Sequence, residues 1–356
     1  MMPTRVCIVG AGPSGLYVAK ALKRYIQGVK IDFFEKLDQP LGLLKFGVAP
    51  DRQSLRQTGQ KLVQDDFRFF YNVTVGKDIQ IPTLLKDYNF CVISCGAESP
   101  VSLKIPGDDT LGVFDSLDFI RWYNGYKYID TSGSVKRYFN RLATLGRPTT
   151  ACVIGNGNVA LDVSRILLAP EESLLDTPKT LINDISAANI CKVNVLGRRD
   201  WIYSKFTNSE LRHLLNSPSL LSVVDPSVNI QDSTNRILQR KGDIYKSMQG
   251  NWGSEKNKIL QFHFSTTAEK IHEEEGQVAR LDVKKRETVH FTSIPCDLLI
   301  KCIGYTHNEI AKELEKYIDN KRVFSSGWFK SEGKGDLSAT IRESVELAKL
   351  IAGSSH

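Results

Sequence analysis

The sequence predicts an α/β fold with two Rossmann-like domains. The prediction depends on residues 5–25 and 151–168, where a short apolar strand, a glycine turn and a helix with an apolar stripe follow in that order. Neither strand shows the polar alternation of a half-exposed strand, and this is typical of parallel sheets covered on both faces. Two further apolar runs, 88–94 and 298–303, lead to Gly96 and Gly304 and predict additional buried strands.

The first glycine turn has the spacing of a dinucleotide-binding turn. We expect Gly10 to make the tight turn, Gly12 to let a pyrophosphate approach the backbone, and Gly15 to let the helix lie close to its strand. The start of the helix offers free N–H groups to phosphates. Glu35 ends the second apolar strand, about 20 residues further on, where a carboxylate can bind both hydroxyls of a ribose. A glycine turn alone is weak evidence because it can be purely structural, but the complete order favours an adenine dinucleotide with a free 2′-hydroxyl.

The second glycine turn reads Gly155-Asn-Gly-Asn-Val-Ala160 and leads to a different strand end. The next apolar strand, 192–196, is followed by Gly197, Arg198 and Arg199, with no acid at the position that corresponds to Glu35. A guanidinium group there can bind a 2′-phosphate through two hydrogen bonds, which selects NADP over NAD. The alternative is a pair of solvated surface arginines, and we favour phosphate binding because the pair follows the strand directly.

Composition narrows the class of protein. The chain has 356 residues, enough for two domains, and a formal charge of +7 without the basic, aromatic-rich block of a nucleic-acid-binding protein. A basic surface that faces an acidic protein partner is the simpler interpretation. Seven cysteines without a Cys-x-x-Cys pair indicate free thiols in a reducing compartment, and the histidines show no metal-ligand spacing. We therefore expect a soluble protein with no metal site, no membrane span and no visible presequence.

The remaining segments connect these features. Residues 36–51, rich in glycine and proline, predict a loop that either crosses a flavin ring or forms a surface turn. The glycines of 333–340 precede a terminal helix at 341–352 and again offer N–H donors to a flavin or a pyrophosphate. The other expected elements are a helix at 54–66 and strands at 67–75, 259–264 and 278–283, the last two joined by a turn at 272–276.

Two polar stretches of the second half have structural and functional interpretations. Thr207 followed by Glu210 is a capping box, which alone explains Glu210, although a role near a nicotinamide is also possible. The basic stretch 234–248 is either a solvated helix face or a docking surface for an acidic electron carrier. Its candidate docking residues are Arg236, Arg240 and Lys241.

The chain resembles the adrenodoxin reductase family, the NADPH-dependent reductases of two-iron ferredoxins, almost from end to end. The resemblance implies the glutathione reductase-like fold, in which an NADP domain is inserted into a discontinuous FAD domain. We expect the FAD domain at 1–104 and 304–356 and the NADP domain at 105–303. The stretches that carry the resemblance are VGAGPSG at 9–15, LLKFGVAPD at 43–51, GNGNVALDV at 155–163, LGRR at 196–199, FT at 206–207, ELR at 210–212, IGY at 303–305 and SGW at 326–328.

The resemblance also implies the residues that bind the two coenzymes. The expected FAD residues lie in both FAD segments: Gly10, Gly12, Pro13, Ser14, Gly15, Glu35, Lys36, Leu43, Val48, Gly96, Trp328, Gly335, Asp336 and Leu337. Among these, Trp328 and Gly335 are expected to touch both flavin and nicotinamide. The expected NADPH residues are Gly155, Asn156, Gly157, Asn158, Val159, Arg198, Arg199 and Glu210. Glu210 and Trp328 are the candidate catalytic residues.

The implied reaction is transfer of a hydride from NADPH to FAD, followed by single-electron transfers to a two-iron ferredoxin, which supports iron–sulfur cluster assembly or a similar electron-transfer pathway. The absence of Cys-x-x-Cys argues against the dithiol-dependent reductases of the same fold. Family resemblance suggests a monomer in a mitochondrion or a related organelle, with the cytosol as the alternative.

Two departures from the family pattern leave other interpretations open. Arg52 stands where the family usually has histidine, and Asp336 stands where it has a small apolar residue. These changes are compatible with a degenerate flavoprotein that acts as a binding module. A second alternative is the electron-supplying subunit of a glutamate-synthase-like complex, although the cysteine motifs of its clusters do not occur in the sequence.

Overall fold

The chain divides into two compact units. The computed structural model describes residues 3–50, 52–126, 131–169, 177, 179–254, 256–335 and 337–354. The first unit comprises Met1–Val48, Arg52–Val101 and Gly304–His356, and the second comprises Ala49–Asp51 and Ser102–Ile303. Apart from the short stretch 49–51, the chain passes from the first unit to the second between residues 101 and 102, where the sequence suggested 104 and 105. It returns to the first unit between residues 303 and 304.

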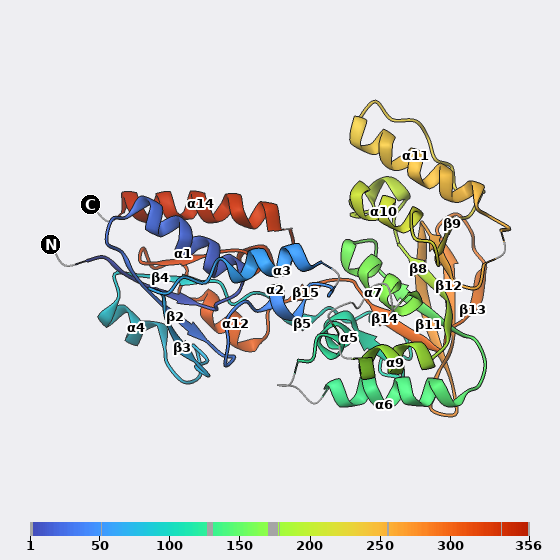
Figure 1. The fold of residues 1–356 in the computed structure, drawn as a ribbon, viewed down its shortest axis with the longest axis horizontal. Coiled ribbons are helices and arrows are strands. Elements are labelled where there is room, and N and C mark those ends of the chain that lie inside the picture. The colour runs from blue at the N-terminus through green and yellow to red at the C-terminus, as the bar shows by residue number, and fades with distance from the viewer. Residues whose placement is uncertain are drawn as a thin grey trace. The chain divides into compact units, whose positions relative to one another are not determined.

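The first unit is built on a parallel sheet with the strand order β16-β4-β1-β2-β3 (Figure 1). β1 is central, and its neighbours β2 and β4 continue the chain on opposite sides of it. Such a switch in strand order opens a crevice at the carboxyl ends of the strands, where ligands bind in open α/β sheets. The strands are β1 (Arg5–Val9), β2 (Lys30–Glu35), β3 (Arg68–Tyr71), β4 (Phe90–Ile93) and β16 (Val323–Ser325).

Helices cover both faces of this sheet. Val6 and Ile8 of β1 belong to a core cluster that includes α1 and α14, whereas Cys7 and Val9 belong to a second cluster with α4 and α12. Figure 1 shows α1 and α14 side by side although they come from opposite ends of the sequence. The helices are α1 (Pro13–Tyr25), α2 (Leu43–Phe46), α3 (Gln53–Gln60), α4 (Ile81–Asp87), α12 (Glu309–Glu315), α13 (Trp328–Ser331) and α14 (Leu337–Gly353), and a short antiparallel pair joins β5 (Ser99–Pro100) to β15 (Tyr305–Thr306).

The second unit repeats this architecture around a parallel sheet with the order β6-β14-β7-β8-β10-β9. The strands are β6 (Val113–Asp115), β7 (Thr149–Ile154), β8 (Ile190–Leu196), β9 (Leu221–Val224), β10 (Ile259–His263) and β14 (Leu298–Lys301). The helices are α5 (Ser116–Tyr123), α6 (Thr131–Thr144), α7 (Asn158–Leu168), α9 (Lys179–Ala187), α10 (Asn208–Leu215), α11 (Arg236–Gly250) and the 3-10 turn η1 (Trp201–Tyr203). The predicted fold class, with two Rossmann-like domains, is confirmed.

Some predicted element bounds were wrong. The turn predicted at 272–276 is mostly strand, because β11 (Thr266–Glu274) continues to Glu274 and pairs antiparallel with β12 (Gln277–Lys285). Register shifts between Ala268 and Lys270 and between His272 and Glu273 break the two-residue alternation by which a strand is recognised. β13 (Phe291–Pro295) completes this small sheet. The helix predicted at 54–66 ends at Gln60, and no helix of the described residues is long and apolar enough to cross a membrane.

Candidate nucleotide-binding sites

The three glycines of the first turn have different surroundings. Gly10 has φ +94°, a backbone conformation that side chains rarely adopt. A methyl group added to Gly15 would lie within 3.0 Å of the carbonyl O of Gly10 and of Ser94 Oγ, so α1 can approach β1 only because residue 15 has no side chain. A methyl group on Gly12 would meet no atom within 4 Å. The backbone at Gly12 is thus open to a ligand at the first turn of α1.

Glu35 is held in place at the carboxyl end of β2. Its side chain is 5% exposed, Oε2 accepts a hydrogen bond from the N–H of Ala11 over 2.7 Å, and Oε1 accepts one from the N–H of Leu37 over 3.0 Å. Burial raises the pKa of this carboxyl group, and the two backbone hydrogen bonds partly oppose the shift. Each carboxylate oxygen keeps a further lone pair, so the group can still accept hydrogen bonds from a ribose.

The C-terminal segment lies against the start of α1. Ser14 Oγ donates to Ser326 Oγ over 2.7 Å, and a methyl group on Gly327 would lie 2.5 Å from Ser14 Cβ and Oγ. Gly327 has φ +63° and is the N-cap of α13, whose first residue is Trp328. The SGW stretch is therefore placed beside the first glycine turn by direct contact within the first unit.

Trp328 is held by contacts with Tyr305 and Gly335. Its indole ring stacks on Tyr305 with the centroids 6.0 Å apart, and Nε1 donates to the carbonyl O of Gly335 over 3.3 Å. Gly335 has φ +98° and precedes α14, in which Leu337 is the first residue and packs partly against the core. The prediction for Asp336 lies outside the described residues.

The other predicted FAD residues of the first unit are spread over three loops. Pro13 is the first residue of α1, and Leu43 is the first residue of α2, just after Gly42 with φ +48°. Val48 is partly buried against the core. Lys36 forms an ion pair with Glu98. A methyl group on Gly96, which has φ +78°, would meet no atom within 4 Å, so the backbone is open at the end of β4 as well.

The second glycine turn repeats the pattern of the first. Gly155 has φ +141°, and a methyl group on it would lie within 3.0 Å of the backbone of Cys302. A methyl group on Gly157 would meet no atom within 4 Å, as at Gly12. Asn156 lies in contact with Gly197 across the carboxyl ends of β7 and β8, and its buried Oδ1 has no hydrogen-bond partner among the described residues. A buried polar atom without a partner beside an open helix start fits a site that a polar ligand completes.

Arg198 and Arg199 directly follow β8 and are both exposed. Within the described parts of the chain, neither guanidinium group has a hydrogen-bond or ion-pair partner. Asp200, the nearest carboxylate in sequence, instead caps η1, because its Oδ1 accepts from the N–H of Trp201 over 2.5 Å. The two arginines are therefore available to an anion, and their binding of a 2′-phosphate stays a prediction.

A hydrogen bond joins the starts of α7 and α10 through Asn158 and Thr207, and Glu210 lies in the first turn of α10. Thr207 caps α10 as predicted, because its Oγ1 accepts from the N–H of Glu210 over 3.3 Å. In a capping box the N–H of Thr207 would donate to the side chain of Glu210. Here this N–H donates to Oδ1 of Asn158 over 3.0 Å. Burial lowers the pKa of Arg165 on α7, and the charge of Glu210 acts in the opposite direction. Val159, the residue after Asn158, packs partly against the core.

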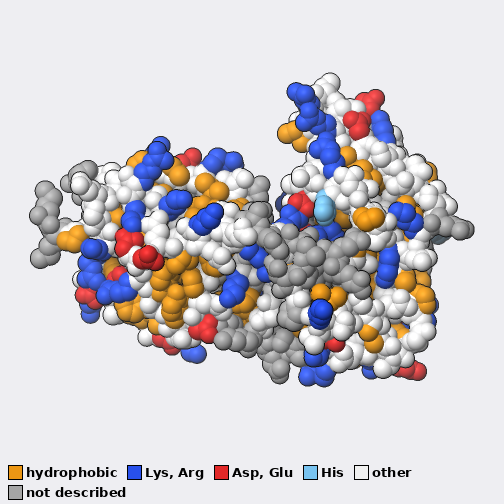
Figure 2. Space-filling model, viewed as in Figure 1, with side chains coloured by type: hydrophobic (Ala, Val, Ile, Leu, Met, Phe, Trp, Pro, Cys, Tyr) orange, Lys and Arg blue, Asp and Glu red, His pale blue; other side chains and the backbone are white. Residues whose placement is uncertain are grey.

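The docking prediction for α11 was wrong for one residue. Lys241 is only 6% exposed, and its Nζ donates to the carbonyl O of Ser204 over 2.6 Å, so it does not belong to a docking surface. Arg236 and Arg240 are exposed as expected, and Ile237 between them is 67% exposed. Figure 2 shows basic side chains along α11.

The cysteines do not form a redox-active pair. All seven lie in described parts of the chain, and each is a free thiol. Burial raises the pKa of the Cys95 thiol to about 12, which makes this cysteine a poor nucleophile. Within the described residues no group of histidine, cysteine, aspartate and glutamate could hold a metal ion.

Comparison with known proteins identifies the family. The family model described as pyridine nucleotide-disulphide oxidoreductase matches residues 4–217. The chain belongs to this family. It is an NADPH-dependent oxidoreductase, and the predicted cofactors, FAD and NADP, are confirmed. Both glycine turns and both arginines lie inside the matched range.

Similar proteins agree with the predicted resemblance to adrenodoxin reductases. The chain is 28% identical to the mitochondrial NADPH:adrenodoxin oxidoreductase of Bos taurus, over 98% of the chain and 78% of that protein. It is 29% identical to a probable mitochondrial NADPH:adrenodoxin oxidoreductase of Schizosaccharomyces pombe, over 97% of the chain and 81% of that protein. The structure of Mycobacterium tuberculosis FprA in complex with NADPH matches with a TM-score of 0.85 and 25% identity, over 99% of the chain and 85% of FprA.

Sequence reasoning missed several contacts that shape the two sites. It did not find the contact between Asn156 and Gly197 or the hydrogen bond between Ser14 and Ser326. Both join segments that are adjacent only after the strand order is known, so no local signal reports them. The burial of Lys241 did have a signal, because Lys241, Tyr245 and Met248 share the apolar face of α11.

Proposed function

We propose that this protein is an NADPH:ferredoxin reductase that holds FAD in the first unit and NADPH in the second. One observation supports the assignment most strongly: the two glycine turns are alike, but the strands beside them end differently. Glu35, next to the first turn, favours a ribose with a free 2′-hydroxyl, whereas Arg198 and Arg199, next to the second, favour a 2′-phosphate. One chain therefore has separate sites for two adenine dinucleotides.

The proposed FAD site uses the open backbone of the first unit. The N–H groups at the start of α1 bind the pyrophosphate beside Gly12, and Glu35 accepts hydrogen bonds from the adenosine ribose. Leu43, Val48 and Trp328 contact the flavin. The remaining members of the proposed site are Gly10, Pro13, Ser14, Gly15, Lys36, Gly96, Gly335 and Leu337.

The proposed NADPH site has the same construction with a different anion contact. The pyrophosphate lies at the start of α7 beside Gly157. The buried Oδ1 of Asn156 can only accept a hydrogen bond, so its partner is a hydroxyl or amide donor of the coenzyme and not a phosphate oxygen. Arg198 and Arg199 bind the 2′-phosphate. The coenzyme is bordered on its α7 side by Gly155, Asn158 and Val159 and on its α10 side by Glu210. Asn158 orients the first turn of α10 through its hydrogen bond with Thr207.

A one-electron carrier is the proposed acceptor. FAD can take a hydride from NADPH and release the electrons one at a time, which suits an iron–sulfur carrier. The seven free thiols provide no dithiol route for a two-electron transfer. The bovine and yeast relatives are named for adrenodoxin, and we propose the same class of partner, a two-iron ferredoxin, and a mitochondrial location for this chain.

The proposed docking surface is the exposed face of α11 and α10. A depression of about 220 Å³ is lined by Arg212, Leu215, Arg240, Asp243, Ile244 and Ser247. Arg212 and Arg240 contribute positive charge to it from two helices that lie side by side (Figure 1). Arg236 and the exposed Ile237 extend this surface by one turn of α11. This surface is complementary to an acidic carrier whose contact patch has an apolar centre.

Reversing the charge of Arg236 and Arg240 tests this surface. The double variant Arg236→Glu/Arg240→Glu should raise the KM for a two-iron ferredoxin by about tenfold or more at low salt, because like charges then meet at the interface. NADPH-driven reduction of a small neutral dye should be unchanged. The measurement is steady-state turnover with each acceptor at several salt concentrations.

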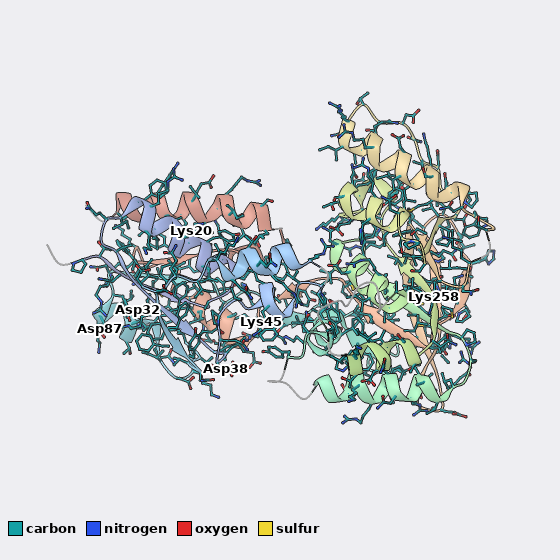
Figure 3. The ribbon with its side chains drawn as sticks, in the orientation of Figure 1. Lys20, Asp32, Asp38, Lys45, Asp87 and Lys258 are labelled. Carbon is teal, nitrogen blue, oxygen red and sulfur yellow. The ribbon has the colours of Figure 1, made fainter. Side chains whose placement is uncertain are left out.

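A matched control uses two exposed lysines of the first unit, Lys20 on α1, labelled in Figure 3, and Lys86 on α4. Lys20→Glu/Lys86→Glu changes the net charge by the same amount and should leave both rates unchanged. An equal fall in ferredoxin and dye reduction by the α11 variant, or an equal effect of the control on ferredoxin reduction, would refute docking at α11.

A further inference from the structure

The segment that carries Arg198 and Arg199 is held at its start by backbone contacts. The N–H of Gly197 donates to the carbonyl O of His263 over 2.9 Å, and the N–H of Ser265 donates to the carbonyl O of Arg199 over 3.0 Å. These contacts join the segment to the connection between β10 and β11. They involve no side chain, so they do not explain which residues determine the direction of the two arginines.

Side chains of α11 hold the end of the same segment. Nζ of Lys241 donates to the carbonyl O of Ser204 over 2.6 Å, and Oγ of Ser204 lies 3.0 Å from the hydroxyl O of Tyr245. Lys241 and Tyr245 are four residues apart and therefore share one face of α11. Because Ser204 is buried, its carbonyl O and its hydroxyl group rely on these two partners instead of water.

Trp201 adds a third contact between the segment and α11. It is 1% exposed, its Nε1 donates to the carbonyl O of Asn229 over 3.1 Å, and its ring meets that of Tyr245 edge to face with the centroids 6.0 Å apart. A methyl group on Gly242 would lie 3.3 Å from Cη2 of Trp201, so the backbone of α11 packs directly on the indole. The segment from 197 to 204 thus has one end on a sheet and the other on a helix.

Lys241 is an unusual residue for this position. It has no carboxylate partner among the described residues, and burial lowers the pKa of its ammonium group. A buried ammonium group costs free energy, so leucine or methionine would fill the same space better if packing were the only need. What those residues lack is a donor at the end of a long stem that can reach the carbonyl O of Ser204.

We propose that Lys241 is a positioning residue for the 2′-phosphate site. By fixing the end of segment 197–204, it sets the direction in which Arg198 and Arg199 project, without itself touching the coenzyme. The inference rests on the proposed binding of NADPH by these arginines and adds a residue that determines selectivity for an adenosine 2′-phosphate. It is independent of the identity of the electron acceptor.

Titration with two small ligands tests the proposal on the full-length, FAD-loaded protein. The ligands are 2′,5′-ADP and 5′-AMP, which differ only in the 2′-phosphate, so their affinity ratio measures selectivity without any turnover. Lys241→Met keeps the long stem and removes the donor. Loss of this one hydrogen bond should weaken 2′,5′-ADP by about three- to tenfold and leave 5′-AMP unchanged, as measured by isothermal titration calorimetry.

Two controls accompany the variant. Lys246→Met, on the same helix, removes an exposed lysine whose Nζ lies 2.7 Å from Asp232 Oδ1, and it should leave both affinities unchanged. Lys241→Arg keeps a charged donor and should retain more selectivity than Lys241→Met. Lys241→Leu and Lys241→Gln serve in place of the methionine variant if it does not fold, since each removes the ammonium donor.

The outcomes separate the inference from the site on which it rests. Equal weakening of 2′,5′-ADP and 5′-AMP by Lys241→Met would show a merely structural role and overturn the proposal. Unchanged selectivity in Lys241→Met, with selectivity lost in Arg198→Ala/Arg199→Ala, would also overturn it but leave the 2′-phosphate site standing. Unchanged selectivity in both variants would refute the site itself.

Discussion

Replacing Arg198 and Arg199 with alanine should weaken NADPH binding by at least about a hundredfold, because each charge-assisted hydrogen bond to a phosphate contributes about 1.5–3 kcal/mol. NADH lacks the 2′-phosphate and should bind the double variant about as well as it binds the native protein. Both guanidinium groups are exposed, and neither has a partner among the described residues, so their removal breaks no contact of the fold. The measurement is the dissociation constant of each nucleotide, together with kcat/KM for each.

A control with matched chemistry is available on α6. Arg137→Ala/Arg141→Ala removes two arginines of the same unit from a helix that packs on α5 and α9, and it should leave the preference for NADPH intact. Equal losses of NADPH and NADH in Arg198→Ala/Arg199→Ala would show that the arginines contact a part common to both nucleotides. In that case the discrimination between NADPH and NADH would have to come from another residue.

Alanine at Gly12 and at Gly15 should have opposite effects on folding and on FAD binding. A methyl group at Gly15 would lie within 3.0 Å of the carbonyl O of Gly10 and of Ser94 Oγ, so α1 must move away from β1. Overpacking of this kind costs about 1–3 kcal/mol or more, and Gly15→Ala should lower the unfolding temperature of the protein without cofactor. Binding of FAD then falls only as a consequence.

Gly12→Ala should instead fold normally and bind FAD much more weakly. Gly12 has φ −80° and ψ −174°, which alanine adopts readily, and its surroundings are open. Exchange of glycine for alanine at a helix N-cap costs only about 1 kcal/mol or less. The methyl group would, however, occupy the space in which a pyrophosphate approaches the backbone. The affinity for FAD should therefore fall by about a hundredfold. Thermal unfolding without cofactor and flavin absorbance after reconstitution distinguish the two variants.

Either variant can contradict this account. If Gly12→Ala binds FAD as tightly as the native protein, the pyrophosphate does not lie beside Gly12. If Gly15→Ala unfolds at the native temperature, the close approach of α1 to β1 is not set by the missing side chain.

The features that could be predicted from sequence are those written in local order. Strand, glycine turn and helix follow each other within residues 5–25 and again within 151–168. The residues at the end of the next strand predict which charge lies beside each turn, negative at Glu35 and positive at Arg198 and Arg199. The predicted fold class is confirmed, whereas the roles of the individual site residues stay predictions. The arrangement of strands around β1 and β7 then places Glu35, Arg198 and Arg199 at the carboxyl edges of the sheets.

Other features required the tertiary structure. The contact of Asn156 with Gly197 depends on β8 lying beside β7, and the contact of Ser14 with Ser326 depends on β16 lying beside β4. The charge of Lys241 predicts a surface position, although the residue lies on the apolar face of α11 and is buried. The hydrogen bond to the carbonyl O of Ser204 gives the buried ammonium group an acceptor that no sequence pattern indicates.

Anaerobic mixing of the FAD-loaded protein with NADPH tests the central claim most directly, namely that one chain binds both coenzymes and passes reducing equivalents between them. The account predicts that NADPH bleaches the absorbance of the oxidised flavin much faster than NADH does, and that a two-iron ferredoxin then restores it. A protein that takes up no flavin on reconstitution, or a bound flavin that NADPH does not bleach, would contradict it.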